Sequence, residues 1–148
     1  MDNDSVTRLR RVVGKLARQL NASATGEGLT PTQASVLGLV AGRGPLSIAA
    51  LTELEGLNPT MLSRVLSKLD EAGLVERIRD PADLRTASVR ITPEGNRIHE
   101  RIRNRRTAIV SECVARLPAK HADALTRALP ALEALVDELH ITDSRSVG

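Results

Sequence analysis

The chain has 148 residues and a formal net charge of +3, and 41% of its residues are hydrophobic and 26% charged. This length and composition fit one globular domain, and the single cysteine excludes an internal disulfide framework. The absence of aromatic residues argues against modules that stack unpaired bases on aromatic side chains. We see no secretion signal and no apolar run long enough to span a membrane, so we expect a cytoplasmic protein.

Apolar residues at helical spacing predict a first helix over residues 6–20, which the stretch "TGEGL" ends. The second helix is predicted to begin at "TPTQ" and to run to about Ala41. There, Thr30 is the N-cap, Pro31 the first helical residue and Gln33 the partner in a capping box.

Two further helices are predicted between residues 47 and 73. Ser47 caps the short helix "IAALTELE", which Gly56 closes. The next helix begins at "NPTM", with Asn58 as the N-cap and Pro59 as its first residue, and ends at Gly73. Its apolar side carries Leu62, Val65, Leu66 and Leu69.

A β-hairpin is predicted next, with strands over residues 74–79 and 86–92 and a turn over residues 80–85. The second strand alternates apolar and polar residues, as a half-buried strand does. Residues 58–106 carry eleven basic and seven acidic groups, so positive charge concentrates around this hairpin. A polyanion is the natural partner of such a patch.

The motif "TPEG" opens a long helix from Pro93 to about Leu117, with Thr92 as its N-cap and Glu94 where the helix dipole favours an anion. A last apolar helix follows Pro118. Pro130 lies inside it and is expected to kink it or split it in two.

The element order predicts a mainly α fold with a small β-hairpin, arranged as a winged helix-turn-helix. Residues 29–95 resemble the multiple-antibiotic-resistance regulator (MarR) family of bacterial transcription factors. The motifs that carry the resemblance are "AGLVER", Asp83-x-Arg85 followed by a strand, and "TPEG". By element order the resemblance covers nearly the whole chain.

The resemblance implies that the helix over residues 58–72 enters the DNA major groove and that Arg85 reaches into the minor groove, held by Asp83. The family usually has a basic residue between these two, where this chain has Leu84. We take Arg64 as the candidate for bidentate contact with guanine. The expected DNA-binding residues are Asn58, Pro59, Thr60, Ser63, Arg64, Ser67, Lys68, Arg77, Arg79, Asp83, Arg85 and Arg90.

The resemblance also implies a single domain over residues 1–148 with a DNA-binding lobe at residues 29–92. Residues 1–28 and 93–148 would form dimerisation helices, because their apolar stripes exceed what one small domain covers. A two-fold dimer implies a pseudo-palindromic operator in double-stranded DNA. The expected dimerisation residues are Val6, Leu9, Val13, Leu16, Ile109, Leu125, Leu129, Leu132, Val136 and Leu139.

Arg97, Arg101 and Arg105 repeat every four residues along the long helix. They are either a solvated face or part of a pocket for a small, anionic effector, the kind of ligand that relatives bind. Cys113 lies on the apolar stripe of that helix and is expected to be buried. The three histidines are scattered, so we expect no metal site and no cofactor.

The sequence is therefore interpreted as a homodimeric repressor that binds specific double-stranded DNA and responds to a small effector. An enzyme is disfavoured, because the chain lacks a nucleophile–base constellation, a glycine-rich phosphate loop and suitably paired carboxylates. The remaining alternative is a winged-helix module that binds a ligand or a protein and has no DNA-binding activity.

Overall fold

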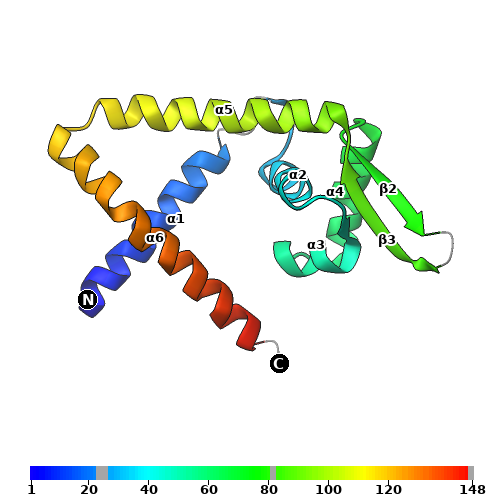
Figure 1. Cartoon of the computed structure of the whole chain (residues 1–148), viewed down its shortest axis with the longest axis horizontal. Coiled ribbons are helices and arrows are strands. Elements are labelled where there is room, and N and C mark those ends of the chain that lie inside the picture. The colour runs from blue at the N-terminus through cyan, green and yellow to red at the C-terminus, as the bar shows by residue number, and fades with distance from the viewer. Residues whose placement is uncertain (23–26, 81–82, 147–148) are drawn as a thin grey trace. The chain divides into compact units, whose positions relative to one another are not determined.

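The computed structural model describes residues 1–22, 27–80 and 83–146, and the side chains at 80, 83–86 and 143–146 are left out of the description. The chain divides into two compact units, Met1–Thr107 and Ala108–Gly148. Figure 1 labels α1 (Asn3–Ala22), α2 (Pro31–Arg43), α3 (Ile48–Glu55), α4 (Pro59–Glu71), β2 (Val75–Asp80), β3 (Asp83–Ile91), α5 (Pro93–Ala115) and α6 (Ala119–Ser146). None of the described helices is long and apolar enough to cross a membrane.

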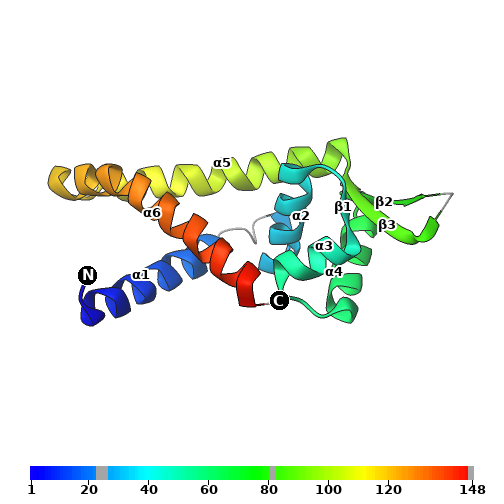
Figure 2. The ribbon, with the colours of Figure 1, turned by 60° about the horizontal axis from the view of Figure 1, so that its bottom comes forward.

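The hydrophobic core belongs to the first unit, where α2, α3 and α4 pack with the hairpin (Figure 2). Leu37, Leu51, Leu62 and Val89 each come from a different element and are fully buried. Ile102 adds one buried side chain from α5. No polar or charged residue of the described chain is buried, so apolar burial is the main favourable contribution in this unit.

The predicted helix starts are confirmed. Thr30 and Gln33 form a reciprocal capping box, with Gln33 N–H donating to Thr30 Oγ1 at 3.2 Å and Thr30 N–H donating to Gln33 Oε1 at 3.0 Å. The Asn58 side chain accepts from Met61 N at 2.8 Å, and Ser47 Oγ accepts from Ala50 N at 3.0 Å. Each cap satisfies backbone donors that an α-helix leaves free at its start.

The hairpin is part of a three-stranded antiparallel sheet in the order β1-β3-β2. The additional strand, β1 (Leu46–Ser47), pairs Leu46 with Val89 and Ser47 with Ser88. The sequence analysis missed it, because two residues are too few to show an alternating pattern.

The structure contradicts part of one expectation and the whole of another. A single helix, α6, runs through Pro130, so the predicted split is wrong, whereas the predicted kink stays a prediction. A proline removes one backbone donor, and the hydrogen bonds on both sides can preserve the helix. Cys113 is exposed in the single chain, because the described residues do not cover this part of α5.

Candidate nucleic-acid interface

Helix α4 has one apolar and one polar side. The four predicted apolar residues are all buried, which fixes the opposite side toward solvent. Thr60, Ser63, Arg64 and Lys68 are exposed on that side, and Ser67 is half-buried. Arg64 makes no hydrogen bond or ion pair with the described residues. The N-terminal turns of α4 therefore present hydrogen-bonding groups that are available to a ligand.

Met61 is a residue of this helix that the sequence analysis did not single out. Its side chain is 44% exposed among polar neighbours. Its position in the sequence could have indicated it, because Met61 lies in the first turn after the Asn58-Pro59 cap and is an apolar residue outside the buried set of α4. An exposed apolar side chain at the start of a groove-reading helix can contact a thymine methyl group.

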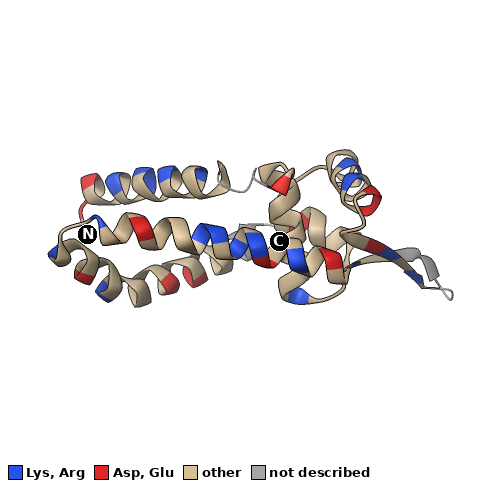
Figure 3. Cartoon of the chain, turned by 90° about the horizontal axis from the view of Figure 1, so that it is seen from above, with Lys and Arg blue, Asp and Glu red and all other residues tan. Residues whose placement is uncertain are grey.

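The two faces of the hairpin differ in charge. Side chains alternate between faces along a strand, so Arg77 and Arg79 share one face of β2, opposite Val89 and Ala87 of β3. Arg90 lies on the other face, where it pairs with Glu76 across the strands. Figure 3 shows basic and acidic residues interspersed along the hairpin. Among the described side chains of the hairpin, Arg77 and Arg79 are the unpaired cations, and Arg90 forms an ion pair on the opposite face.

A crevice lies between α4 and this face of the hairpin. Arg77 Nη2 donates a hydrogen bond to Ser67 Oγ at 3.2 Å, which joins β2 to α4. The cavity beside this bond has a volume of about 220 Å³. It is lined by Ile48, Ser63, Leu66, Arg77, Arg79 and Ala87.

The wing-tip prediction rests on Asp83 and Arg85. Both belong to strand β3, and Asp83 pairs with Asp80 beyond a register shift in the ladder. Their side chains lie outside the described residues. The contact between Asp83 and Arg85 and the minor-groove role of Arg85 stay predictions.

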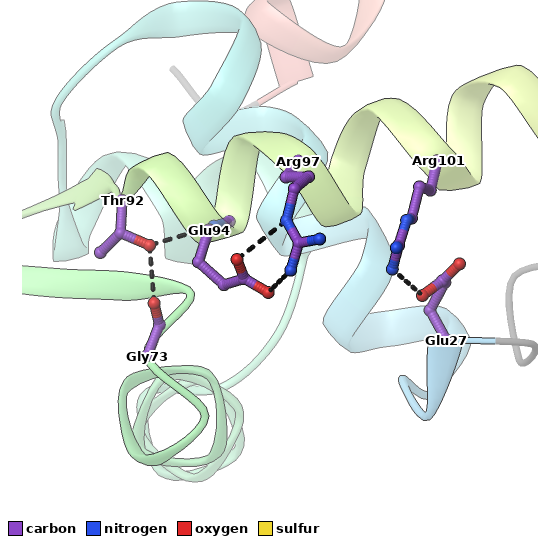
Figure 4. A network of polar contacts seen from close by, with 7 residues as sticks. Glu27, Gly73, Thr92, Glu94, Arg97 and Arg101 are labelled. Atoms are coloured by element: carbon purple, nitrogen blue, oxygen red, sulfur yellow. Dashed lines mark hydrogen bonds and ion pairs between the residues drawn. The ribbon is translucent and has the colours of Figure 1, made fainter.

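One hydroxyl joins the exit of α4 to the start of α5 (Figure 4). Thr92 Oγ1 donates to the Gly73 carbonyl at 2.6 Å and accepts from Gly95 N at 3.0 Å. Gly73 has a φ of 73°, a conformation that glycine adopts without strain, and it ends α4 as expected. Gly95 is buried against the backbone of Leu74. This junction fixes the point at which the long helix leaves α4 and the hairpin.

The three arginines predicted to line an effector pocket, Arg97, Arg101 and Arg105, are exposed on α5. Arg97 binds Glu94 within the first turns of α5, with Nε to Oε2 at 3.0 Å, and Arg101 Nη1 lies 3.6 Å from Glu27 Oε2 (Figure 4). The hydrogen bond and charge of Arg97 lower the pKa of Glu94. Arg105 is exposed and lines no cavity described in the structure.

A cavity of about 360 Å³ instead lies between α2 and the other side of α5. Its α5 lining includes His99, Ile102, Arg103 and Arg106, and its α2 lining includes Gly38. Arg106 Nε is buried without a hydrogen-bond partner in the described structure. Burial, followed by the charge of Arg103, lowers the pKa of His99. Arg103 Nη2 pairs with Glu100 Oε2 at 2.9 Å, so the group in the cavity with an unused hydrogen bond is Arg106 Nε.

His99, Arg103 and Arg106 lie on the side of α5 that faces α2. His99 and Arg103 follow Ile98 and Ile102, which pack on the core, by one position, and Arg106 lies three positions after Arg103. Arg97, Arg101 and Arg105 form a different row along the helix, and charge alone does not separate the two sets.

The predicted dimerisation residues are incompletely covered in the single chain. Seven are exposed, among them Leu16 at 56% and Leu139 at 58%, and Leu9, Ile109 and Leu132 are half-buried. In the first unit they lie on α1, and in the second they lie on the end of α5 and on α6. Each unit therefore exposes large apolar side chains, a feature that is typical of interaction surfaces.

The sequence model of the MarR family matches residues 29–87, which covers α2 to the first half of β3. A Mycobacterium bovis protein named "Uncharacterized HTH-type transcriptional regulator Mb0904" is 29% identical over 140 residues, 93% of this chain and 98% of the relative. A Bacillus subtilis protein named "HTH-type transcriptional repressor MdtR" is 24% identical over 70% of this chain and 66% of the relative.

Solved structures share the fold. Wild-type MarR from Escherichia coli superimposes with a TM-score of 0.74 at 23% identity, covering 89% of this chain and 96% of that protein. The predicted winged helix-turn-helix fold is therefore confirmed.

Proposed function

We propose that this chain, whose residues 29–87 match the sequence model of the MarR family, is a homodimeric repressor that binds specific sequences in double-stranded DNA. One observation carries this proposal. The exposed polar side of α4 and the Arg77–Arg79 face of the hairpin border one crevice, so a reading helix and a cationic ribbon flank the same surface.

Specific base contacts are assigned to the first turns of α4. Arg64 is exposed and makes no hydrogen bond or ion pair with described residues, so its planar fork is free to bind guanine in the major groove. Thr60, Ser63 and Lys68 add hydrogen-bonding groups to the same side. Arg85 is proposed to enter the minor groove on the strength of the family motif alone.

The test is a binding titration on a duplex that the wild-type protein selects from a random pool. We expect Arg64→Ala to lose discrimination between the selected duplex and a scrambled one, with about 1–3 kcal/mol lost on the cognate site. Arg127→Ala is the matched control, because Arg127 is an exposed arginine on α6. If the pool yields no enriched sequence, or if Arg64→Ala keeps full discrimination, the assignment fails.

The homodimer is proposed from the exposed apolar residues on α1, the end of α5 and α6. Covering side chains such as Leu16 and Leu139 would add roughly 25 cal/mol for each Å² of apolar surface removed from water. Two-fold symmetry would present two α4 helices to two half-sites. Sedimentation at micromolar concentration should give a dimer, and a monomer would remove the half-site argument.

The proposed effector site is the cavity lined by His99, Arg103 and Arg106. Its volume of about 360 Å³ lies within the range of small-molecule sites, and the unpartnered Arg106 Nε favours an acceptor such as a carboxylate. Benzoate is a suitable probe, since Ile102 and Leu39 supply apolar lining. The name of the B. subtilis relative, a transcriptional repressor, supports the repressor role. The release of DNA by a ligand is proposed from the cavity.

The effector proposal predicts that benzoate raises the melting temperature of the wild-type protein and releases its DNA, and that Arg106→Leu abolishes both effects. Arg105→Leu is the matched control, because Arg105 is exposed on the same helix and does not line the cavity. Equal responses from the two variants would refute this site.

A further inference from the structure

We propose that the crevice between α4 and β2 holds one backbone phosphate of the bound duplex in each half-site, and that Ser67 is a positioning residue that aims Arg77 at it. This inference rests on the proposed DNA-binding function and adds the chemical group that the crevice takes. Base reading is left to Arg64 and its neighbours on the outer side of α4.

The polar groups at this crevice are suited to donate hydrogen bonds. Arg77 and Arg79 carry guanidinium groups, which have donors and no acceptor. Arg77 Nη2 donates one hydrogen bond to Ser67 Oγ, and the other N–H groups of this guanidinium remain available to a ligand. Ser63 contributes a second hydroxyl to the lining. Hydrogen-bond donors that converge on one site favour a ligand that has only acceptors, and the phosphodiester group of DNA is such a ligand.

The charges of the two arginines are not neutralised within the described structure. Glu76 pairs with Arg90 on the opposite face of the hairpin, and Lys68 and Glu71 pair with each other on α4. No described carboxylate forms an ion pair with Arg77 or Arg79. The crevice therefore keeps two uncompensated positive charges, which an anion would balance.

The remaining lining and the size also fit a phosphate in a nucleic-acid backbone. Ile48, Leu66 and Ala87 supply apolar atoms, which lower the local dielectric constant and can contact the carbon atoms of deoxyribose. The volume of about 220 Å³ lies below the range of roughly 300–1,000 Å³ that drug-sized ligands occupy. A single phosphate with part of its sugar is a better match than a free small molecule.

Ser67 fixes the direction in which Arg77 points. Arginine has many rotamers, and holding one of them in advance reduces the entropy lost on binding. The hydrogen bond at 3.2 Å restrains the guanidinium beside the crevice before DNA arrives. Ser67 therefore acts on binding mainly through Arg77, and its removal should have no further effect once Arg77 is absent.

The experiment combines protein variants with single methylphosphonate substitutions, which remove the charge of one phosphate at a time in the selected duplex. Wild-type protein, Arg77→Ala, Ser67→Ala, the double variant and the control Arg127→Ala are titrated against each duplex at several salt concentrations. Circular dichroism melts confirm that every variant is folded.

We expect Arg77→Ala to bind about tenfold more weakly per half-site and to lower the slope of log K against log salt by about one per half-site. One methylphosphonate position in each half-site should weaken wild-type binding and have no effect on Arg77→Ala. Ser67→Ala should weaken binding roughly three- to fivefold, and not at all in the Arg77→Ala background.

The proposal is overturned if Arg77→Ala binds with unchanged affinity and salt slope, or if it weakens binding while its methylphosphonate profile equals that of the wild type. Both results leave the proposed function standing, because wild-type binding is measured in the same titrations. A wild-type protein that enriches no duplex would instead refute the proposed function, and the phosphate assignment with it.

Discussion

Replacing Gly95 by alanine tests how tightly α5 is held against the exit of α4. A Cβ atom at this position would lie 2.7 Å from Ile91 Cγ1 and 2.9 Å from the Leu74 carbonyl carbon, and nearer still to the Leu74 oxygen. Carbon atoms in contact prefer about 3.5–4.0 Å, so the segments must separate by roughly 0.6–0.8 Å or more. Two of these atoms belong to backbone, which cannot rotate away as a side chain does.

The displacement would affect three hydrogen bonds. Thr92 N donates to the Leu74 carbonyl at 3.1 Å, and the Thr92 hydroxyl links Gly73 and Gly95. Overpacking of this kind costs about 1–3 kcal/mol, and a weakened N-cap costs about 1 kcal/mol more. Alanine recovers roughly 1 kcal/mol of helix propensity. These contributions sum to about 1–3 kcal/mol, and because the overlap with the Leu74 oxygen is severe we expect the free energy of unfolding to fall by the upper part of this range, about 2–3 kcal/mol.

The assay is urea and thermal unfolding followed by far-ultraviolet circular dichroism, since the chain has no tryptophan or tyrosine fluorescence. The expected loss corresponds to a fall in Tm of roughly 5–10 °C. Gly42→Ala is the matched control, because Gly42 lies in α2 and its Cβ would meet no atom within 4 Å. A Gly95→Ala protein as stable as the wild type, beside a stabilised Gly42→Ala protein, would refute the close-packing argument.

Three other predictions follow from the same structure. Thr92→Val should lower the free energy of unfolding by about 1–2 kcal/mol in urea titrations, because the hydroxyl that serves Gly73 and Gly95 is lost; Thr92→Ser should retain most of that energy. Calorimetry should show that benzoate binds more tightly as the pH falls through the lowered pKa of His99, because the protonated ring adds a positive charge to those of Arg103 and Arg106. The negative charge of Glu100 opposes this effect. The His99→Gln variant should lose the pH dependence. In the absence of ligand, lowering the pH destabilises the protein, because the unfolded chain binds the proton at the ordinary histidine pKa and the folded chain only at the lowered pKa. The contribution of His99 to the free energy of unfolding therefore falls as the pH drops between these two pKa values. Val136→Asp should convert the proposed dimer to a monomer in sedimentation, since a charge would replace an exposed apolar side chain of α6.

Features set by neighbouring residues were predictable from the sequence. The caps at Thr30, Ser47 and Asn58 depend on side chains that bond to backbone three residues away, so the pattern contains both partners. The buried side of α4 follows from helical periodicity for the same reason.

Features that depend on distant partners were not predictable. The pairing of Glu76 with Arg90 requires the register of β2 against β3, and it removes Arg90 from the face that carries Arg77. The cavity arginines, Arg103 and Arg106, are distinguished from Arg97 and Arg101 only by the rotation of α5 against α2. The distribution of charged residues along the sequence predicts neither the register of the two strands nor the rotation of α5.

The double role of the Thr92 hydroxyl has a mechanical consequence. The carboxyl end of one helix and the amino end of the next are tied to a single oxygen atom, so a tilt at the head of α5 stretches one bond unless Gly73 moves with it. A change in the tilt of α5 at this point is therefore transmitted to the end of α4 through the Thr92 side chain.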